Sequence, residues 1–550
     1  MLARPSSRSV PSQLCIILHD FLELATSPWP VLKQGEGTMT AHYNACADLL
    51  DRNVAEGRGS KIAFIDPQNQ VTYEGLMKAS ARVANLLRSH GVRREDRVAI
   101  VMLDTVDWPA VFLGAIRAGV VPVPLNTLLP AETYRYMLAD SRAKALFVSS
   151  PLYASVAFVL EGLPDLENVF CVGGIEEGHV LDFDTLARQQ PSEFAPVECS
   201  PDDIAFWLYS SGSTGAPKGT KHVQSSMMAT AKLYGQGVLG IREDDVCLSA
   251  AKFFFAYGLG NSLSFPLSAG ATTILNPDRP TPALMYRMLA KYQPSLFFGV
   301  PTLYAAMLGD ASLAEENGSS KLRLCASAGE ALPEHIGSTW KKRFGSDILD
   351  GVGSTEMLHI FLSNAPGDVV YGTSGRAVPG YDLRLLDDAL QPVVDGDVGE
   401  LYVRGPSAAD GYWNQREKSR ATFQGEWTRT GDKYTRDSSQ RYKYCGRADD
   451  MFKVSGIWVS PFEIEAALAS HPAVLEAAVV AKADEDGLLK PKAFIILKQG
   501  ASTDGLDAAL KEHVKKAAGA WKYPRWIEVM DNLPKTATGK IQRFKLRDSS

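Results

Sequence analysis

The sequence predicts an α/β fold in which strands alternate with helices, because helical and strand patterns take turns from Thr40 onward. Residues 73–90 repeat apolar side chains at helical spacing, and residues 97–103 form a nearly continuous apolar run typical of a buried strand. Residues 110–118 predict a second helix, and residues 120–124 predict a short extended segment. This alternation predicts parallel sheets connected by crossover helices.

The helix predicted for residues 73–90 has an apolar face, as expected for a helix that packs on a core. Its members are Leu76, Ala79, Val83 and Leu87. Two later segments, residues 400–405 and 441–446, predict short antiparallel strands instead. Since 550 residues are too many for one core, we expect at least two domains.

The composition excludes several classes of protein. A net charge of −6 and a pI near 5.9 argue against a nucleic-acid partner. No apolar run approaches the roughly 18 residues of a membrane helix, so we expect no membrane span. The seven cysteines are dispersed without a C-x-x-C pair, which favours free thiols in a reducing compartment, the cytoplasm, over disulfides or a zinc site.

Residues 1–38 lack a periodic pattern and are expected to lie outside the fold. A targeting peptide is one interpretation. We hypothesise instead that Met39 is the native start and that residues 1–38 are an untranslated leader read as protein. Gly35 and Glu36 can be encoded by purine-only codons, and they stand just upstream of Met39, where a bacterial ribosome-binding site would lie. A peptide from native cells that covers residues 22–33 would contradict this hypothesis.

A glycine-rich loop at residues 209–219 follows the apolar run 204–208. A strand followed by such a loop turns backbone N–H groups toward phosphate oxygens, while hydroxyls add donors and Lys218 adds a cation. Pro217 and Gly219 depart from the Walker pattern, and a flexible surface turn is the alternative. The candidate phosphate-binding residues are Ser210, Ser211, Gly212, Ser213, Thr214, Gly215 and Lys218.

This loop resembles the phosphate loop of the adenylate-forming superfamily, which includes acyl- and aryl-CoA synthetases, luciferases and the adenylation domains of peptide synthetases. Four further motifs resemble later elements of that superfamily and follow in the same order. They are Gly353-Ser354-Thr355-Glu356, Thr430-Gly431-Asp432, Gly446-Arg447-Ala448-Asp449-Asp450, and the lysine loop at residues 534–540. The resemblance extends from about Asn44 to Arg547.

The resemblance implies an adenylate-forming (ANL-type) fold. Such a fold has a large N-terminal domain of stacked sheets with helices and a small mobile C-terminal α+β lid. We expect the N-terminal domain at residues 39–446, the hinge at residues 447–449 and the lid at residues 450–550.

The implied reaction activates a carboxylic acid in two steps and requires ATP, Mg²⁺ and coenzyme A (CoA). The carboxylate attacks the α-phosphate of ATP to give an acyl-AMP and pyrophosphate, and a thiol then displaces AMP. By the resemblance, Thr355 contacts the α-phosphate and Glu356 binds Mg²⁺, a hard cation that favours carboxylate oxygen. Without its motif, Glu356 would be interpreted as a solvated loop acid.

Other residues are expected at the nucleotide by the same resemblance. Asp432 has two acceptor oxygens for the ribose hydroxyls, and Arg447 would also reach the ribose. Val352 stands where many relatives have an aromatic residue that stacks on adenine, so apolar contact is expected to replace stacking. The expected adenine contacts are Gly329, Glu330, Ala331, Asp350 and Gly351.

The lysine loop and the hinge are expected to serve different half-reactions. Lys540 would bridge the carboxylate and the α-phosphate during adenylation; without its motif it would be a surface lysine. Asp449 maps to the hinge about which the lid rotates. Lys453 and Gly456 would then line the tunnel for the pantetheine arm of CoA.

Long segments resemble the benzoate-CoA ligase branch. These are residues 251–261, 354–364, 412–414 with 418–423, and 454–461. By this resemblance a flat aromatic acid is surrounded by Ala256, Tyr257, Gly353, His359 and Ile360, with Val300 closing the pocket. A structural role is the alternative for His359. Gln224 departs from the Thr-His pair of many relatives, which predicts a change in local packing or in substituent preference.

Two other functions remain open. The first is a stand-alone enzyme that loads an aryl acid onto a carrier protein, and the second is a binding protein that has lost catalysis. The motif residues expected to act in catalysis and nucleotide binding argue against the second function, because all of them are present: Lys218, Glu356, Asp432, Arg447 and Lys540. The sequence does not decide which ring substituents are accepted or the oligomeric state, for which a homodimer is one option.

Overall fold

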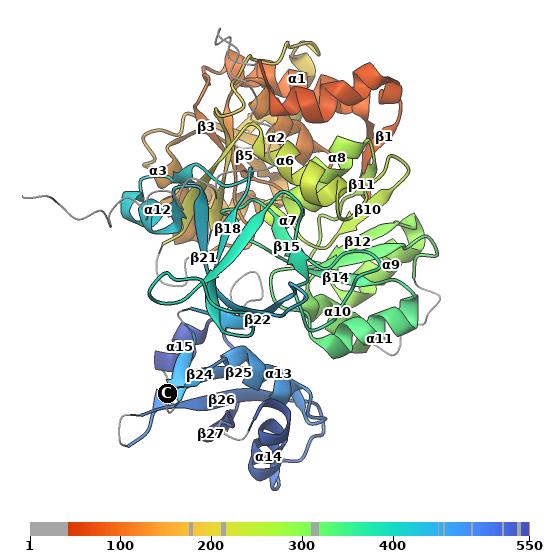
Figure 1. Ribbon diagram of the computed structural model, residues 1–550. Helices are drawn as coiled ribbons and strands as arrows, with labels where there is room; N and C mark the ends of the chain where they lie inside the picture. The colour runs from red at the N-terminus through yellow and green to blue at the C-terminus, as the bar shows by residue number, and fades with distance from the viewer. Residues whose placement is uncertain are drawn as a thin grey trace, which may run out of the picture. The chain divides into compact units, whose positions relative to one another are not determined.

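The computed structural model describes the chain from residue 42 onward with several gaps, and its layers are drawn in Figure 1. The described ranges are 42–174, 180–210, 216–309, 318–448, 450–454, 457–485, 488–519, 522–535 and 541–548. The leader predicted at residues 1–38 lies outside them. The predicted α/β class is confirmed, since parallel sheets with crossover helices make up most of the described chain.

The first sheet is entirely parallel and has five strands in the order β4-β3-β5-β6-β7. Their bounds are β3 Arg97–Val101, β4 Val121–Pro124, β5 Ala143–Ser149, β6 Asn168–Val172 and β7 Leu181–Asp182. The strand predicted at residues 97–103 and the extended segment at residues 120–124 are therefore confirmed as β3 and β4. Helical crossovers precede β4, β5 and β6, as expected for parallel strands, whereas no described helix separates β6 from β7.

The second sheet has nine strands in the order β16-β15-β14-β13-β12-β10-β11-β1-β2. Its centre is parallel, and the pairs at both edges are antiparallel. The bounds are β1 Ile62–Ile65, β2 Gln70–Thr72, β10 Val246–Ser249, β11 Thr272–Ile274, β12 Leu296–Gly299, β13 Leu324–Ser327, β14 Ile348–Gly353, β15 Ile360–Ser363 and β16 Arg376–Ala377.

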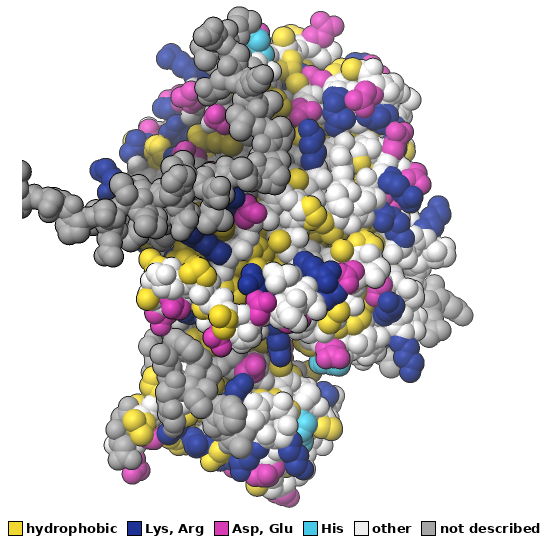
Figure 2. Space-filling view, viewed as in Figure 1, with side chains coloured by type: hydrophobic (Ala, Val, Ile, Leu, Met, Phe, Trp, Pro, Cys, Tyr) yellow, Lys and Arg dark blue, Asp and Glu magenta, His cyan; other side chains and the backbone are white. Residues whose placement is uncertain are grey.

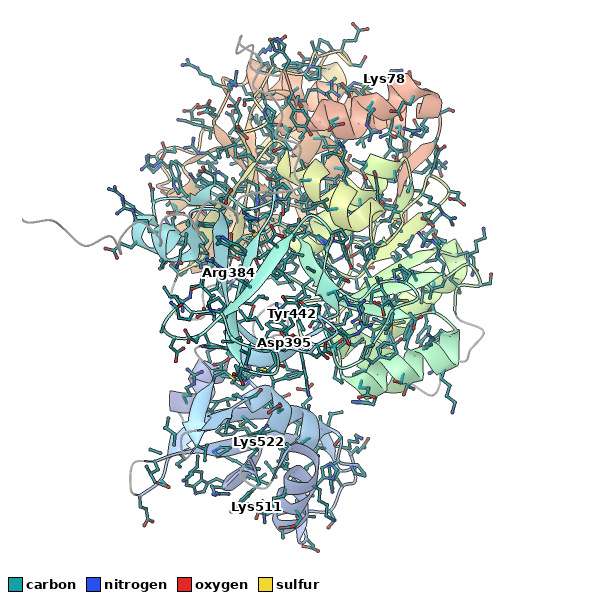
Figure 3. All side chains as sticks on the ribbon, viewed as in Figure 1. Lys78, Arg384, Asp395, Tyr442, Lys511 and Lys522 are labelled. Carbon is teal, nitrogen blue, oxygen red and sulfur yellow. The ribbon has the colours of Figure 1, made fainter. Side chains whose placement is uncertain are left out.

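Helices α1 (Tyr73–Ser89) and α2 (Asp107–Arg117) confirm the helices predicted at residues 73–90 and 110–118. The Thr72 hydroxyl accepts the Gly75 N–H at 3.1 Å and caps the start of α1. On the exposed side of α1, Lys78 (labelled in Figure 3) pairs with Glu74 at 2.7 Å. The apolar face of α1 and nearly all of α2 are buried in one core that includes side chains from both sheets.

Two further cores cover the opposite faces of the sheets. Helix α3 (Ala131–Ser141) and helix α4 (Tyr153–Val156) pack on the first sheet. Helices α9 (Pro282–Tyr292), α10 (Pro301–Gly309) and α11 (Glu334–Phe344) pack on the second sheet, as Figure 1 shows. Helices on both faces of a parallel sheet are the layer arrangement that the alternating pattern predicts.

Antiparallel strands complete the larger part of the chain. One sheet has the order β17-β18-β21-β20 with β22 beside β21, and another has the order β19-β9-β8. The bounds are β8 Ile204–Ser210, β9 Lys218–Val223, β17 Asp382–Leu386, β18 Gly399–Arg404, β19 Gly411–Tyr412, β20 Phe423–Gln424, β21 Trp427–Arg436 and β22 Tyr442–Arg447. The antiparallel strands predicted at residues 400–405 and 441–446 are confirmed as β18 and β22, which both pair with β21.

Side chains of opposite charge are interspersed on the face shown in Figure 2. Arg384, labelled in Figure 3, extends from β17 over the ring of Trp427 in β21, with its guanidinium carbon 4.0 Å from the ring centre. Asp395 and Tyr442 are labelled nearby; the Tyr442 N–H donates to the Gly375 carbonyl at 2.9 Å and joins β22 to the end of the nine-stranded sheet.

The smaller C-terminal part has its own core. Strands β25 and β26 are antiparallel, and β27 is parallel to β26. Lys522, labelled in Figure 3, pairs with Glu463 at 2.5 Å and joins α13 to the start of β27. The bounds are β23 Phe452–Val454, β24 Ile457–Val459, α13 Pro461–Ala469, β25 Val474–Ala483, β26 Leu489–Leu497, α14 Leu506–Ala518, β27 Trp526–Val529 and α15 Arg543–Asp548. Among the described helices, none has the length and apolarity that crossing a membrane requires.

Candidate active site

Seven of the predicted nucleotide and acid contacts lie at one edge of the nine-stranded sheet. Ligands of open parallel sheets bind beyond the carboxyl ends of the strands, and β12, β13 and β14 end at this edge. The predicted residues within or directly after these strands are Val300, Gly329, Glu330, Ala331, Asp350, Gly351 and Gly353. The parallel pairing of the three strands brings together residues that are up to 53 positions apart, from 300 to 353.

Two buried polar atoms at this edge have no hydrogen-bond partner. Ser327 and Asp350 are paired residues of β13 and β14, and Ser327 Oγ and Asp350 Oδ1 are both unpartnered. Burial raises the pKa of Asp350 well above its usual value, against the backbone N–H groups that stabilise the charged form. An unpartnered carboxyl oxygen beside the predicted adenine contacts suits an exocyclic amine of a purine.

The phosphate loop connects two antiparallel strands. Ser210 at the end of β8 pairs with Lys218 at the start of β9, so the two ends of the loop lie side by side. The predicted contacts Ser211, Gly212, Ser213, Thr214 and Gly215 lie outside the described residues.

Glu356 follows β14, and its carboxylate is held near both ends of that loop. Tyr412 Oη donates to Glu356 Oε1 at 2.8 Å, and Ser210 Oγ lies 3.4 Å from the same oxygen. The Lys218 ammonium lies 4.2 Å from the centre of the Tyr412 ring. Burial lowers the pKa of Lys218, and the negative charge of Glu356 opposes this shift. Together these side chains place one cation, the Lys218 ammonium, and the carboxylate oxygens of Glu356 at the two ends of the glycine-rich loop.

These donors fit a magnesium ion that is shared with phosphates. In the part of the chain that the structure describes, no three His, Cys, Asp or Glu side chains converge to form a metal group. Mg²⁺ in phosphoryl-transfer sites is held by one or two carboxylates together with substrate phosphates and water. A single carboxylate, Glu356, next to hydroxyl and ammonium groups is consistent with that mode of binding.

The sequence predicted no site role for Tyr412. It lies on β19, where it pairs with Thr220 of β9. That pairing carries the tyrosine hydroxyl to Glu356, and burial together with the nearby carboxylate raises the pKa of Tyr412, so the hydroxyl stays protonated and donates. The only sequence signal was the likeness of residues 412–414 to the benzoate branch.

His222 and Gln224 are buried on and just after β9. The His222 ring stacks on Phe206 with ring centres 5.1 Å apart, and burial lowers the pKa of His222 to about 3. Gln224 Oε1 accepts the Ala45 N–H at 2.8 Å. The departure at Gln224 is therefore a packing contact to the segment that begins the described chain, one of the two outcomes that the sequence predicted.

Asp432 and Arg447 lie opposite each other on β21 and β22. Arg447 Nη1 donates to Asp432 Oδ1 and to the Thr430 carbonyl, each at 3.0 Å. Between them, Gly431 has a φ of 72°, and a Cβ there would lie 2.8 Å from Arg447 Nη2. The Thr-Gly-Asp turn thus holds the two predicted ribose contacts against each other.

The predicted acid contacts form two layers. Ala256, Tyr257 and Val300 are partly exposed and Gly353 is exposed, whereas His359 and Ile360 are 2% and 1% exposed. A Cβ at Gly353 would lie 2.5 Å from the His359 carbonyl oxygen, so only glycine lets β14 and the segment before β15 approach this closely. The first four residues border open space, and the last two lie behind them.

His359 is neutral and its orientation is fixed. Its Nε2 lies 3.2 Å from the Tyr257 carbonyl oxygen, which only accepts, so Nε2 carries the proton. Burial lowers the pKa of His359 to about 3, against the opposing effect of this hydrogen bond. Aromatic rings of Tyr234, Tyr257 and Phe265 surround the imidazole at centre distances of 5.5, 5.5 and 4.4 Å.

Two of the residues predicted for the thiol step, Asp449 and Gly456, lie outside the described residues, and so does Lys540, which was predicted for the adenylation step. The backbone of Lys453 is described and pairs with Trp458 between β23 and β24. The loop that contains Lys540 is closed at its base, where Lys535 bridges Ile541 and the Gln542 N–H donates to the Pro534 carbonyl at 2.8 Å.

A network of ion pairs joins the last helix to the residue after the predicted hinge. Arg543 Nε and Nη2 donate to the two oxygens of Glu465 at 3.0 and 2.7 Å, and Nη1 lies 3.5 Å from Asp450 Oδ2. Arg547 pairs with Asp450 as well. Glu465 Oε1 also accepts the Val479 N–H at 2.7 Å. The motifs named Asp450 within the hinge element but did not indicate these partners.

Comparisons with known proteins agree with this site. Residues 50–413 match the family model of AMP-binding enzymes, and residues 463–540 match that of the AMP-binding enzyme C-terminal domain. The chain is 55% identical to the 4-hydroxybenzoate--CoA/benzoate--CoA ligase of Rhodopseudomonas palustris, over 92% of this chain and 94% of that protein. It is 54% identical to the benzoate--CoA ligase of Thauera aromatica, over 92% of this chain and 96% of that protein.

A solved structure extends the comparison to the fold. A benzoate CoA ligase from Burkholderia xenovorans LB400 has a TM-score of 0.85 at 50% identity, covering 92% of this chain and 100% of that one. This chain belongs to the AMP-binding enzyme family and has its adenylate-forming fold. Within that family it lies in the benzoate-CoA ligase branch, so the family and branch that the motifs predicted are confirmed.

Proposed function

We propose that this protein is an AMP-forming ligase that joins benzoate or a substituted benzoate to coenzyme A. In the first step, a carboxylate oxygen of the acid bonds to the α-phosphorus of ATP while the bond to pyrophosphate breaks. In the second step, the sulfur of CoA bonds to the acyl carbon while AMP leaves and the thiol proton is released. Membership of the benzoate-CoA ligase branch over 92% of the chain supports this reaction.

One observation of the geometry supports it most directly. The Glu356 carboxylate lies within 3.4 Å of Ser210 at one end of the phosphate loop, and Lys218 at the other end lies over the Tyr412 ring that holds Glu356. Residues from four separate segments therefore place a carboxylate and a cation at the same loop. That arrangement suits neutralisation of a departing pyrophosphate.

The first step depends on the phosphate side of the site. Ser210 to Gly215 and Lys218 hold the β- and γ-phosphates, and Thr355 contacts the α-phosphate. Glu356 holds Mg²⁺, which when bound neutralises the charge that builds up on the phosphate oxygens. Tyr412 orients the Glu356 carboxylate through its 2.8 Å hydrogen bond. Lys540 bridges the carboxylate of the acid and the α-phosphate.

The nucleoside is held by groups on two sheets. Asp432 accepts the ribose hydroxyls, and Arg447 supports it from the neighbouring strand. Adenine lies against Gly329, Glu330 and Ala331, with Gly351 and the unpartnered Asp350 oxygen at its polar edge. Val352 provides the apolar contact in place of a stacked ring.

The acid lies beside the partly exposed layer of the pocket. Ala256, Tyr257 and Gly353 border the ring, and Val300 closes the pocket. His359 and Ile360 support this layer from behind, which accounts for their burial. Since His359 is neutral, it adds no positive charge against the carboxylate, and that charge must come from Lys540.

The second step requires the C-terminal part to turn. We assign residues 39–446 to the N-terminal domain, 447–449 to the hinge and 450–550 to the lid, with Asp449 as the pivot. Lys453 and Gly456 then line the path of the CoA arm. Replacing Asp449 with proline should leave acyl-AMP formation nearly intact and strongly slow thioester formation, and unchanged thioester formation would refute the hinge assignment.

AMP release with ATP, Mg²⁺ and CoA tests the proposed function. The acids are benzoate, its hydroxy, amino and fluoro derivatives, cyclohexanecarboxylate, cinnamate and octanoate. CoA-dependent release that is strongest on benzoate-type acids is the expected result. Acyl-AMP formation without transfer to CoA would point to a carrier protein as acceptor, and no ATP–pyrophosphate exchange with any acid would point to a binding protein.

We also propose a location and an oligomeric state for the whole protein. A cytoplasmic location fits the six cysteines that the structure describes, which are all buried free thiols. The proposed oligomeric state is a homodimer, and light scattering of the purified protein tests it.

A further inference from the structure

A group of buried polar atoms beside the predicted acid contacts makes no hydrogen bond of normal geometry, although Ser363 is a polar neighbour of the Tyr234 hydroxyl and Asn261 of the Tyr257 hydroxyl. The atoms are the hydroxyls of Tyr234 and Tyr257, both polar atoms of the Asn261 side chain, and Nδ1 of His359. Tyr234 and Asn261 are fully buried, at 0% exposure. Buried polar groups are almost always hydrogen bonded, and each exception calls for a ligand or a water.

These atoms belong to one region of the fold. Tyr257 and Asn261 are four residues apart on the continuous helical segment formed by α7 (Ala256–Leu259) and η6 (Gly260–Ser264), a spacing that places side chains on the same side. Tyr234 lies on η5 (Ala231–Gln236), which packs against η6. The centre of the His359 ring lies 5.5 Å from the centre of the Tyr234 ring and 5.5 Å from the centre of the Tyr257 ring.

Both elements that contribute the unassigned residues are π-helical. Element η5 carries Tyr234 and element η6 carries Asn261, and each follows an ordinary α-helical turn. A π-helical turn inserts an extra residue and changes the direction in which the next side chains project, and such turns are frequent at functional sites. Two of them meeting at one polar group indicates a built site.

Tyr257 connects this group to the acid pocket. Its side chain is partly exposed, whereas its hydroxyl is buried. Burial raises the pKa of Tyr257 well above its usual value, so the hydroxyl remains protonated. Tyr257 is therefore both a predicted acid contact and a member of the buried polar group.

We propose that Tyr234 and Asn261, together with the Tyr257 hydroxyl, form a subsite that binds a hydroxyl or amino substituent on the ring of the acid. This inference rests on the proposed function. The Asn261 amide and a tyrosine hydroxyl can both donate and accept, so the group can pair with a substituent that does both. An unsubstituted ring leaves these atoms to water, and sites built to bind a hydroxyl discriminate strongly against analogues that lack it.

The test compares substituted acids with benzoate on the same variant. We would measure kcat/KM for AMP release with benzoate and with 2-, 3- and 4-hydroxybenzoate and 4-aminobenzoate, in wild type, Tyr234→Phe and Asn261→Leu. For at least one substituted acid, the same in both variants, the ratio of kcat/KM to that of benzoate should fall by tenfold or more. Tyr234→Phe removes only one oxygen, so it decides the question even where Asn261→Leu folds poorly.

Tyr73→Phe is the matched control. The Tyr73 side chain is also fully buried, but its hydroxyl donates to the Ala271 carbonyl at 2.7 Å in the core beside α1. Loss of that hydroxyl should change kcat/KM for all acids by the same factor. The substituted-to-benzoate ratios should therefore stay at the wild-type value.

Two outcomes would overturn the inference, and they differ from each other. If wild type is active on benzoate-type acids and neither variant changes any ratio, the buried atoms bind water only and the inference fails alone. If wild type releases AMP with no aryl acid, the proposed function fails and the subsite with it.

Discussion

Replacing Tyr412 with phenylalanine removes one hydroxyl and keeps the ring beside Lys218. The hydroxyl donates to Glu356 Oε1 at 2.8 Å, and the hydrogen bond from Ser210 Oγ to the same oxygen is longer, at 3.4 Å, and therefore weaker. A hydrogen bond to a charged group contributes about 1.5–3 kcal/mol. Because 1.4 kcal/mol corresponds to tenfold, we expect kcat/KM for ATP to fall about 10- to 100-fold.

The assay is ATP–pyrophosphate exchange with benzoate across a series of Mg²⁺ concentrations. A carboxylate that has lost its orienting donor should bind Mg²⁺ less well, so half-maximal exchange should shift to higher Mg²⁺ in Tyr412→Phe. Tyr43→Phe is the control, since the Tyr43 hydroxyl also donates to a carboxylate, that of Asp48, at 2.8 Å but away from the site. Exchange and Mg²⁺ dependence within twofold of wild type would refute the role of Tyr412.

The other predictions concern catalysis, packing and pH. Lys540→Ala should lower acyl-AMP formation about 10²–10³-fold while keeping thiol transfer to added acyl-AMP, and equal loss of both steps would contradict its assignment. Gly258→Ala places a Cβ 2.0 Å from the Lys252 carbonyl oxygen, so thermal melting should show a loss of about 1–3 kcal/mol. Burial lowers the pKa of His222 and His359 to about 3, against about 6.5 when unfolded, so the folded protein binds fewer protons and the free energy of unfolding should fall as pH drops below about 6.5. Melting temperatures from about pH 7.5 to 5 should fall less steeply in His222→Gln than in wild type, and parallel curves would contradict this.

Local patterns predicted the elements where the pattern itself fixes the structure. Helix α1 begins at the predicted residue 73 because Thr72 caps it and its apolar side chains repeat at helical spacing. Strand β3 ends two residues before the prediction, at Val101, because pairing with β5 stops there while the apolar run continues. The motifs that contain Glu356 and Asp432 could be recognised from the sequence because the residues of each motif are contiguous.

Contacts between distant segments could not be predicted in this way. The hydrogen bond from Tyr412 to Glu356 depends on the pairing of β19 with β9, and no residue near Tyr412 encodes that register. Asp432 and Arg447 were each predicted at the ribose, but their ion pair follows from the register of β21 against β22. The polar group around Tyr234 and Asn261 requires two helical segments to pack together, which a single sequence does not show.

The ion pairs of Asp450 have a practical consequence for how the protein is handled. Since Arg547 pairs with Asp450, helix α15 lies beside the residue that follows the proposed pivot in the chain. The C-terminal part therefore begins and ends at the same place. A purification tag fused after residue 550 would follow α15 by only two residues, and it should slow thioester formation more than the same tag at the other end of the chain.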